Sequence, residues 1–100
     1  MNKGIEISNY EIAEHLKTEE DIQLYLEEVM KEDNPALILS ALGDIAKARN
    51  MSQLAKEVGI SREGLYKALS GKGNPTFTTI LKIVKALGLR FELQSANVNI

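Results

Sequence analysis

Side chains that could perform catalysis are few in this chain of 100 residues, and they form no recognisable set. The single histidine, His15, lies among carboxylates with no nucleophile placed beside it, so acid–base catalysis is not indicated. Residues 19–21 are consecutive acids without the alternating ligands and central glycine of a calcium loop. The stretch GKG at residues 71–73 lacks the spacing of a phosphate-binding loop. Because these candidates do not form a site and no cysteine is present, we expect no metal, no cofactor and no enzymatic activity.

The segment 51–70, MSQLAKEVGISREGLYKALS, has the spacing of two short helices that cross steeply. Ala55 is small where the second helix must pack, and Gly59 tolerates the positive φ that the turn needs. Leu65, six residues after the glycine, anchors the second helix. The remaining core positions of the pair are filled by Leu54, Val58, Ile60 and Leu69. This joint spacing predicts a DNA-binding helix-turn-helix rather than a helical hairpin without a nucleic-acid role.

The elements around this pair are predicted to be mostly helical, because helix-start and helix-stop residues flank apolar positions at helical spacing. Thr18 begins a capping box, and Asn34 with Pro35 ends one helix and starts the next. Thr76 caps a last helix, which Gly88 ends. The apolar positions expected to face inward on the first and last of these helices are Ile22, Tyr25, Leu26, Val29, Met30, Phe77, Ile80, Leu81, Val84 and Leu87.

Two stretches of alternating residues near the ends of the chain predict short strands. Residues 4–7 read GIEI, and residues 89–93 read LRFEL, with Leu89, Phe91 and Leu93 on one face. Because a lone strand needs a partner, we expect residues 89–94 to pair with residues 4–7 or with the same strand of a second copy.

Charge is distributed unevenly along the chain. Residues 1–33 hold ten acidic and three basic side chains, a net charge of −7, whereas residues 34–100 hold four acidic and nine basic ones, a net charge of +5. This asymmetry favours two surfaces with different partners over simple solvated helix faces. We expect an acidic helical extension at residues 1–33, a helix-turn-helix domain with its terminal strand at residues 34–94, and a tail at residues 95–100.

The chain is also expected to be a soluble cytoplasmic protein. No apolar run approaches the roughly 18 residues that cross a bilayer, and the first residues, MNKGIEISNYEIAEH, lack the apolar stretch of a signal peptide. The absence of cysteine agrees with a reducing compartment.

Over residues 35–88 the sequence resembles the phage-repressor (Cro/Xre) class of helix-turn-helix domains. Over residues 8–94 it more closely resembles the HigA-like antidote proteins, or antitoxins, of addiction modules. The stretches that carry this resemblance are LKTEEDIQLYLEEVM and, behind it, NPALILSALGDIAKARNMSQLAKEVGISREGLYKALSGKGNPTFTTILKIVKALGLRFEL. Together with the helix and strand signals above, it implies an all-α, five- to six-helix bundle of the lambda-repressor-like helix-turn-helix class, with a short strand at one or both ends.

The resemblance implies an antitoxin of a type II toxin–antitoxin module. Such a protein neutralises a small basic RNA-cleaving toxin of the RelE/HigB-like type and represses its own operon. Because one recognition helix covers only a few base pairs, a homodimer on palindromic operator DNA is expected. Two alternatives stay open at this stage, a stand-alone phage-like repressor and an interaction protein that uses the helical fold without DNA.

The recognition helix implied by the resemblance spans residues 61–70. Arg62 suits bidentate reading of guanine, and Glu63 could accept a hydrogen bond from cytosine. Gly64 either lets the backbone approach DNA closely or simply weakens the helix, whereas Tyr66 and Lys67 lie one turn further along. The full set of expected DNA-binding residues is Ser52, Gln53, Ser61, Arg62, Glu63, Gly64, Tyr66, Lys67 and Lys72.

One position departs from the phage-repressor pattern. Such repressors often carry a glutamine at the first position of the first helix of the pair, where its side chain bonds phosphate, and here that position is Met51. Gln53 lies about 200° away around a helix and cannot be assumed to substitute. The residue that caps this helix is either Asn50 or Ser52.

The acidic first third of the chain is expected to lie away from DNA, which it would repel, and to attract the basic toxin. Long-range attraction of this kind mainly raises the association rate. The expected toxin-binding residues are Glu19, Glu20, Glu27, Glu28, Glu32 and Asp33.

Overall fold

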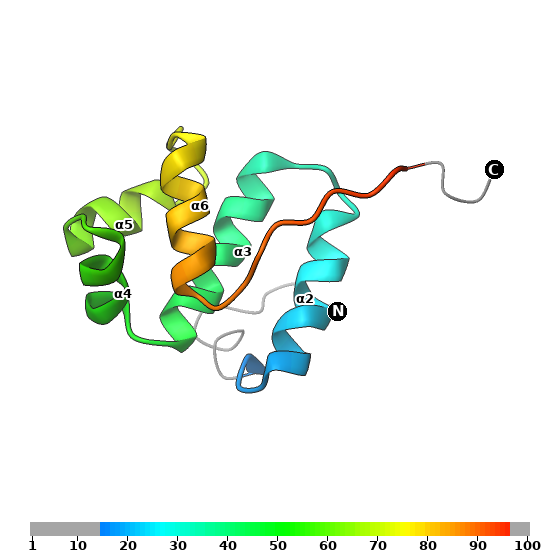
Figure 1. Ribbon diagram of the computed structural model, residues 1–100, viewed down its shortest axis with the longest axis horizontal. Helices are drawn as coiled ribbons and strands as arrows, with labels where there is room; N and C mark the ends of the chain where they lie inside the picture. The colour runs from blue at the N-terminus through cyan, green and yellow to red at the C-terminus, as the bar shows by residue number, and fades with distance from the viewer. Residues whose placement is uncertain (1–14, 97–100) are drawn as a thin grey trace, which may run out of the picture.

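A computed structural model describes residues 15–96 of the chain (Figure 1). All regular structure in this part is helical, which confirms the all-α class but not the strand expected near its end. The five helices are α2 (Glu19–Met30), α3 (Pro35–Ala48), α4 (Met51–Val58), α5 (Arg62–Ala68) and α6 (Phe77–Ala86). None of the described helices is long and apolar enough to span a membrane. The strand expected at residues 4–7 lies outside the described residues, as does most of the helix expected at residues 10–16.

The predicted caps begin the first two of these helices. The Thr18 hydroxyl accepts a hydrogen bond of 3.0 Å from the backbone N–H of Asp21, whose carboxylate accepts one of 3.2 Å from Thr18 N–H. This reciprocal pair is the predicted capping box. At the start of α3 the Asn34 side chain accepts from two backbone N–H groups, and Pro35 occupies the first helical position. These contacts satisfy backbone donors that a helix leaves unpaired at its N-terminus.

The α4–α5 pair is bounded by equally local signals. Asn50, rather than Ser52, caps α4 by accepting from the backbone N–H of Gln53 at 3.0 Å. Gly59 ends α4 with φ +88°, in the left-handed region that glycine adopts without strain. Ser61 then caps α5, so only three residues separate the two helices.

The core forms where α3 and α6 meet the other helices. α2 packs on α3, while α4 packs on both α5 and α6. As predicted, Ala55 and Leu65 are buried between the helices of the α4–α5 pair. The largest side chains that are almost completely buried are those of Ile22, Ile45, Leu65, Ile83 and Leu87.

Three side chains expected to face the core lie at the surface instead. Phe77 is 68% exposed, Leu81 is 41% exposed and Met30 is 46% exposed. Phe77 is the first residue of α6, where no described helix covers it, and its ring packs on that of Phe91 with centroids 5.8 Å apart. The apolar period of α6 therefore continues one turn beyond the part of the helix that the core covers.

No strand is present at residues 89–94 within the described residues. The expected pairing with residues 4–7 lies outside these residues, and pairing with a second copy stays a prediction. Residues 89–95 run in an extended path without regular structure, from the end of α6 across α3 towards α2 (Figure 1). A strand is defined by ladder hydrogen bonds to a neighbour, and no described segment supplies one. The alternating sequence therefore specified an extended path but not its partner.

Candidate functional site

One side of α5 is exposed and carries most of the residues expected to meet DNA. Leu65 is buried, so the opposite side of the short helix points outward. Arg62, Glu63 and Lys67 are exposed, and Tyr66 is 39% exposed. The sequence-predicted residues of the recognition helix therefore lie together on one accessible surface.

Tyr66 is the centre of a basic aromatic cluster, formed by Lys47, Arg62 and Tyr66. The guanidinium carbon of Arg62 lies 5.4 Å from the centroid of the Tyr66 ring, and an Arg62 Nη donates to the Tyr66 hydroxyl at 3.4 Å. The ammonium of Lys47 lies 5.9 Å from the same centroid. Both distances are within the range of cation–π attraction, which holds two positive charges beside one ring at the surface.

Lys47 is the member of this cluster that the sequence did not indicate. It belongs to the last turn of α3, 19 residues before Tyr66, and no periodicity within α3 connects it with α5. The contact arises because α3 and the α4–α5 pair fold against each other.

Gly64 has a local role in positioning this surface. Its backbone N–H donates to the Ser61 hydroxyl at 2.9 Å, and a Cβ atom at Gly64 would lie 3.0 Å from that oxygen. The absence of a side chain thus leaves room for the cap of α5. This contact explains structurally why position 64 is a glycine, in addition to the two interpretations drawn from the sequence.

The other expected DNA-binding residues are spread around the α4–α5 pair. Ser52 is exposed in the first turn of α4. Gln53 donates to the Glu57 carboxylate at 3.3 Å and lines a shallow hollow with Ala86 and Leu87 at the end of α6. Lys72 is exposed in the loop before α6. The structure therefore places Gln53 on the side of α4 that faces the end of α6.

Met51, the position that departs from the phage-repressor pattern, is buried. It is only 6% exposed and belongs to the hydrophobic core. A buried thioether cannot bond phosphate at the surface, so the role that glutamine often has at this position is missing here. Asn50, one residue earlier, uses its side chain to cap the helix.

The acidic side chains of α2 and the turn after it form the acidic face, defined by Glu19, Glu20, Glu27, Glu28, Glu32 and Asp33. All six are exposed. Glu28 pairs with Lys31 at 3.1 Å, and Glu27 accepts from Gln23 at 3.2 Å. α2 lies on one side of α3, while α4 and α5 lie on the other (Figure 1). Within the described residues, the acidic and basic surfaces are therefore at opposite ends of the molecule.

A part-buried hydrogen bond joins the helix of the acidic face to α3. The Tyr25 hydroxyl donates to Oδ2 of Asp44 at 2.6 Å, and Asp44 is only 4% exposed. Burial raises the pKa of Asp44, while the Tyr25 hydrogen bond and the positive charge of Lys47 act to lower it. Burial and the neighbouring Asp44 raise the pKa of Tyr25, so its hydroxyl stays protonated.

Comparison with known proteins gives the family of this chain. A family described as "Probable addiction module antidote protein" matches residues 6–95. A protein of Haemophilus influenzae, described as uncharacterized, is 64% identical over 91 residues, which cover 91% of this chain and 94% of that protein. No solved structure matches the chain significantly. The match spans the acidic face and the α4–α5 pair alike, and the chain belongs to the family of probable addiction module antidote proteins.

Proposed function

We propose that this protein is the antitoxin of a type II toxin–antitoxin module. It neutralises a small basic RNA-cleaving toxin of the RelE/HigB-like type, and it represses its own operon by binding DNA. The family supports the first activity, because an antidote requires a toxin to act on. Both activities are binding events, so the protein is proposed to act without catalysis, as a cytoplasmic homodimer.

The DNA-binding part of the proposal uses α4 and α5 as a lambda-repressor-like helix-turn-helix. The observation that carries it is the basic aromatic cluster on the exposed side of α5. In the major groove, Arg62 would read guanine, while Lys47 and Lys67 would bond phosphates. A short α4 buried against α5 and α6 would hold this surface in place.

The toxin-binding part of the proposal uses the acidic face. An RNA-cleaving toxin must attract phosphate, so its active surface is expected to be basic. Six exposed carboxylates on and after α2 would attract such a surface, on the side of the molecule away from α5. This separation would let one antitoxin hold toxin and DNA at once, without placing the acids beside phosphates.

The DNA activity is tested by a mobility shift with the DNA upstream of the protein's own gene. We expect binding by the wild-type chain and a loss of roughly 1–3 kcal/mol for Arg62→Ala, with relaxed sequence preference. An interaction protein without a DNA role would show no shift.

The toxin activity is tested separately by co-expression with a small basic protein encoded beside the gene. We expect the two proteins to purify together and the antitoxin to relieve growth arrest. A stand-alone repressor would bind DNA in the first assay and give no complex in the second.

A further inference from the structure

The extended segment after α6 has an open backbone. Leu89 N–H donates to the Val84 carbonyl at 3.0 Å and closes the end of the helix. From Arg90 to Leu93, no backbone hydrogen bond joins the segment to another residue of the described part, 15–96. Extended chain with unpaired N–H and C=O groups is a template for pairing with another strand.

The side chains of this segment are already sorted onto two faces. Arg90 and Glu92 lie on the same side, joined by an ion pair of 2.6 Å, and their side chains are 83% and 56% exposed. Leu89, Phe91 and Leu93 alternate with them. Leu89 packs on the core, Phe91 packs on Phe77 and is 42% exposed, and Leu93 is 97% exposed. Within the described residues, the apolar face of Leu89, Phe91 and Leu93 is therefore covered at its first residue and open at its last.

The sequence LRFEL is complementary to itself when it runs antiparallel about Phe91. In that register Arg90 lies opposite Glu92 of the second copy, and Glu92 lies opposite its Arg90. Leu89 lies opposite Leu93 of the second copy, and the two Phe91 rings are neighbours across the axis. Directly opposed residues in an antiparallel pair have Cβ atoms about 5 Å apart, so two opposite-charge pairs form on one face and three apolar pairs on the other.

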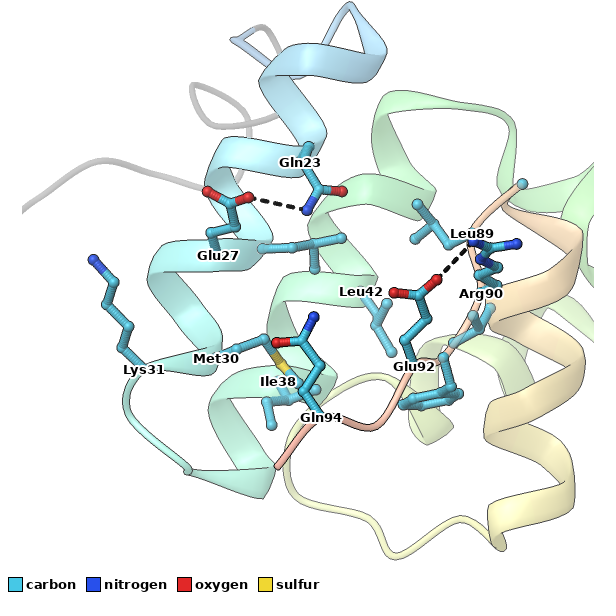
Figure 2. Close-up of a pocket in the computed structure, with 14 residues that line it drawn as sticks. Gln23, Glu27, Met30, Lys31, Ile38, Leu42, Leu89, Arg90, Glu92 and Gln94 are labelled. Carbon is cyan, nitrogen blue, oxygen red and sulfur yellow. Dashed lines mark hydrogen bonds and ion pairs between the residues drawn. The ribbon is translucent and has the colours of Figure 1, made fainter. Parts of the chain in front are cut away.

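A groove beside the segment leaves space for a second strand (Figure 2). It has a volume of about 960 Å³ and lies between the segment and α2. Ile38 and Leu42 of α3 contribute apolar lining between these two walls, and Met30 contributes from α2. The segment itself lines the groove with Leu89 and Phe91 and with the polar side chains of Arg90, Glu92 and Gln94. With Leu93 of the second copy opposite Leu89, that side chain would lie at the part of the groove that Leu89 lines.

We propose that residues 89–93 form the contact between two copies of this chain, as a two-stranded antiparallel ribbon centred on Phe91. The proposal specifies the interface of the homodimer in the proposed function, and it rests on that homodimer. The charge complementarity of Arg90 and Glu92 sets the register. A ribbon of this kind has two-fold symmetry, which is the symmetry that reading a palindromic operator requires.

Charge reversal on one side of the ribbon tests the register. Arg90→Glu places Glu opposite Glu92 of its mate twice per dimer, and Glu92→Arg places Arg opposite Arg90 twice. Each variant alone should dimerise about tenfold more weakly than wild type, or worse, by sedimentation equilibrium. An equimolar mixture of the two variants restores both opposite-charge pairs, so heterodimer should form at concentrations where each variant alone is monomeric. Native mass spectrometry distinguishes it from either homodimer.

Two controls separate the ribbon from other effects of charge. The internal ion pair is lost in both single variants and is not restored by mixing, so heterodimer formation reports only the contact between chains. The double variant Arg90→Glu, Glu92→Arg should dimerise like wild type. Lys56→Glu, on the exposed surface of α4, changes net charge by the same amount and in the same direction as Arg90→Glu and should leave dimerisation unchanged. Both reversed side chains are exposed, and circular dichroism checks that the variants keep their helices.

Three results would overturn the proposal. These are a monomeric wild-type chain, single variants that dimerise as wild type does, and a mixture without excess heterodimer. Operator binding keeps the proposed function distinguishable. Dimers through another surface that still bind operator DNA would refute only the ribbon, whereas an intact ribbon without operator binding would refute the DNA-binding function.

Discussion

The Tyr25 hydroxyl lies 2.6 Å from Oδ2 of Asp44 and donates a hydrogen bond that joins α2 to α3. The positive charge of Lys47, one turn along α3, acts to lower the pKa of Asp44. The ammonium of Lys47 also lies over the Tyr66 ring. The hydrogen bond thus joins α2 to α3, and the charge of Lys47 links Asp44 electrostatically to the basic aromatic cluster. The acceptor of the Tyr25 hydrogen bond, Asp44, is buried, so this hydrogen bond is expected to contribute most to stability.

Replacing Tyr25 by Phe should lower the free energy of unfolding by about 1–3 kcal/mol. The change removes one hydrogen bond to a buried carboxylate and keeps the ring. Chemical denaturation followed by circular dichroism measures the loss. Tyr66→Phe is the matched control, because the Tyr66 hydroxyl has only a 3.4 Å contact with exposed Arg62 and its removal should change stability little. Equal effects of the two substitutions would contradict this prediction.

The raised pKa of Asp44 predicts a particular dependence of stability on pH. Because the folded chain holds this proton more tightly than the unfolded chain, the contribution of Asp44 is fully present below its ordinary pKa of 3.8. That contribution is lost as pH rises through the folded pKa. Asp44→Asn cannot titrate, so the free energy of unfolding of wild type should fall relative to that of the variant across this window. Parallel curves for the two proteins from acid to neutral pH would refute the raised pKa.

Gly59→Ala should destabilise the chain by about 1–2 kcal/mol through backbone strain alone. Gly59 has φ +88°, and a Cβ atom there would meet nothing within 4 Å. Gly59→Asn is the matched comparison, since asparagine tolerates the left-handed region better than alanine does. Thermal or chemical unfolding should rank the proteins as wild type, then Asn, then Ala. A stability for Gly59→Ala that matches or exceeds wild type would be inconsistent with the strain.

Lys67→Ala should weaken binding to operator and unrelated DNA by similar factors. If its ammonium bonds a phosphate, the slope of log affinity against log salt should become about one unit shallower. Arg62→Ala should instead weaken operator binding more than binding to unrelated DNA, because it reads bases. Fluorescence anisotropy at several salt concentrations measures both. If the double variant binds operator as wild type does, α5 is not in the interface.

Reversing three charges of the acidic face, at Glu27, Glu28 and Glu32, should slow toxin association at low salt. Attraction between opposite charges raises the encounter rate and is screened as salt increases. Stopped-flow kinetics with the neighbouring toxin measures the rate, and operator affinity of the same variant should be unchanged. Glu57→Lys on α4 serves as a control outside this face. A rate that is insensitive to both the substitutions and ionic strength would mean that the toxin docks elsewhere.

Local signals in the sequence were sufficient to place the described helices. The caps at Thr18, Asn34, Ser61 and Thr76 each bond a backbone group two or three residues away, and Gly59 and Gly88 adopt the positive φ expected where helices end. The burial of Ala55 and Leu65 also followed from their spacing. Such features depend on a few consecutive residues, so the rest of the fold does not need to be known.

Only the tertiary structure determined the contacts between residues that are distant in the sequence. It brought Lys47 to Tyr66 and Tyr25 to Asp44, and it buried Met51 while leaving Phe77 exposed. The alternation of residues 89–93 indicated an extended path, but the pairing of that path depends on which surface meets it. The helical period determines which residues share a face of a helix. Only the packing of one helix against another determines whether that face meets the core, a partner or water.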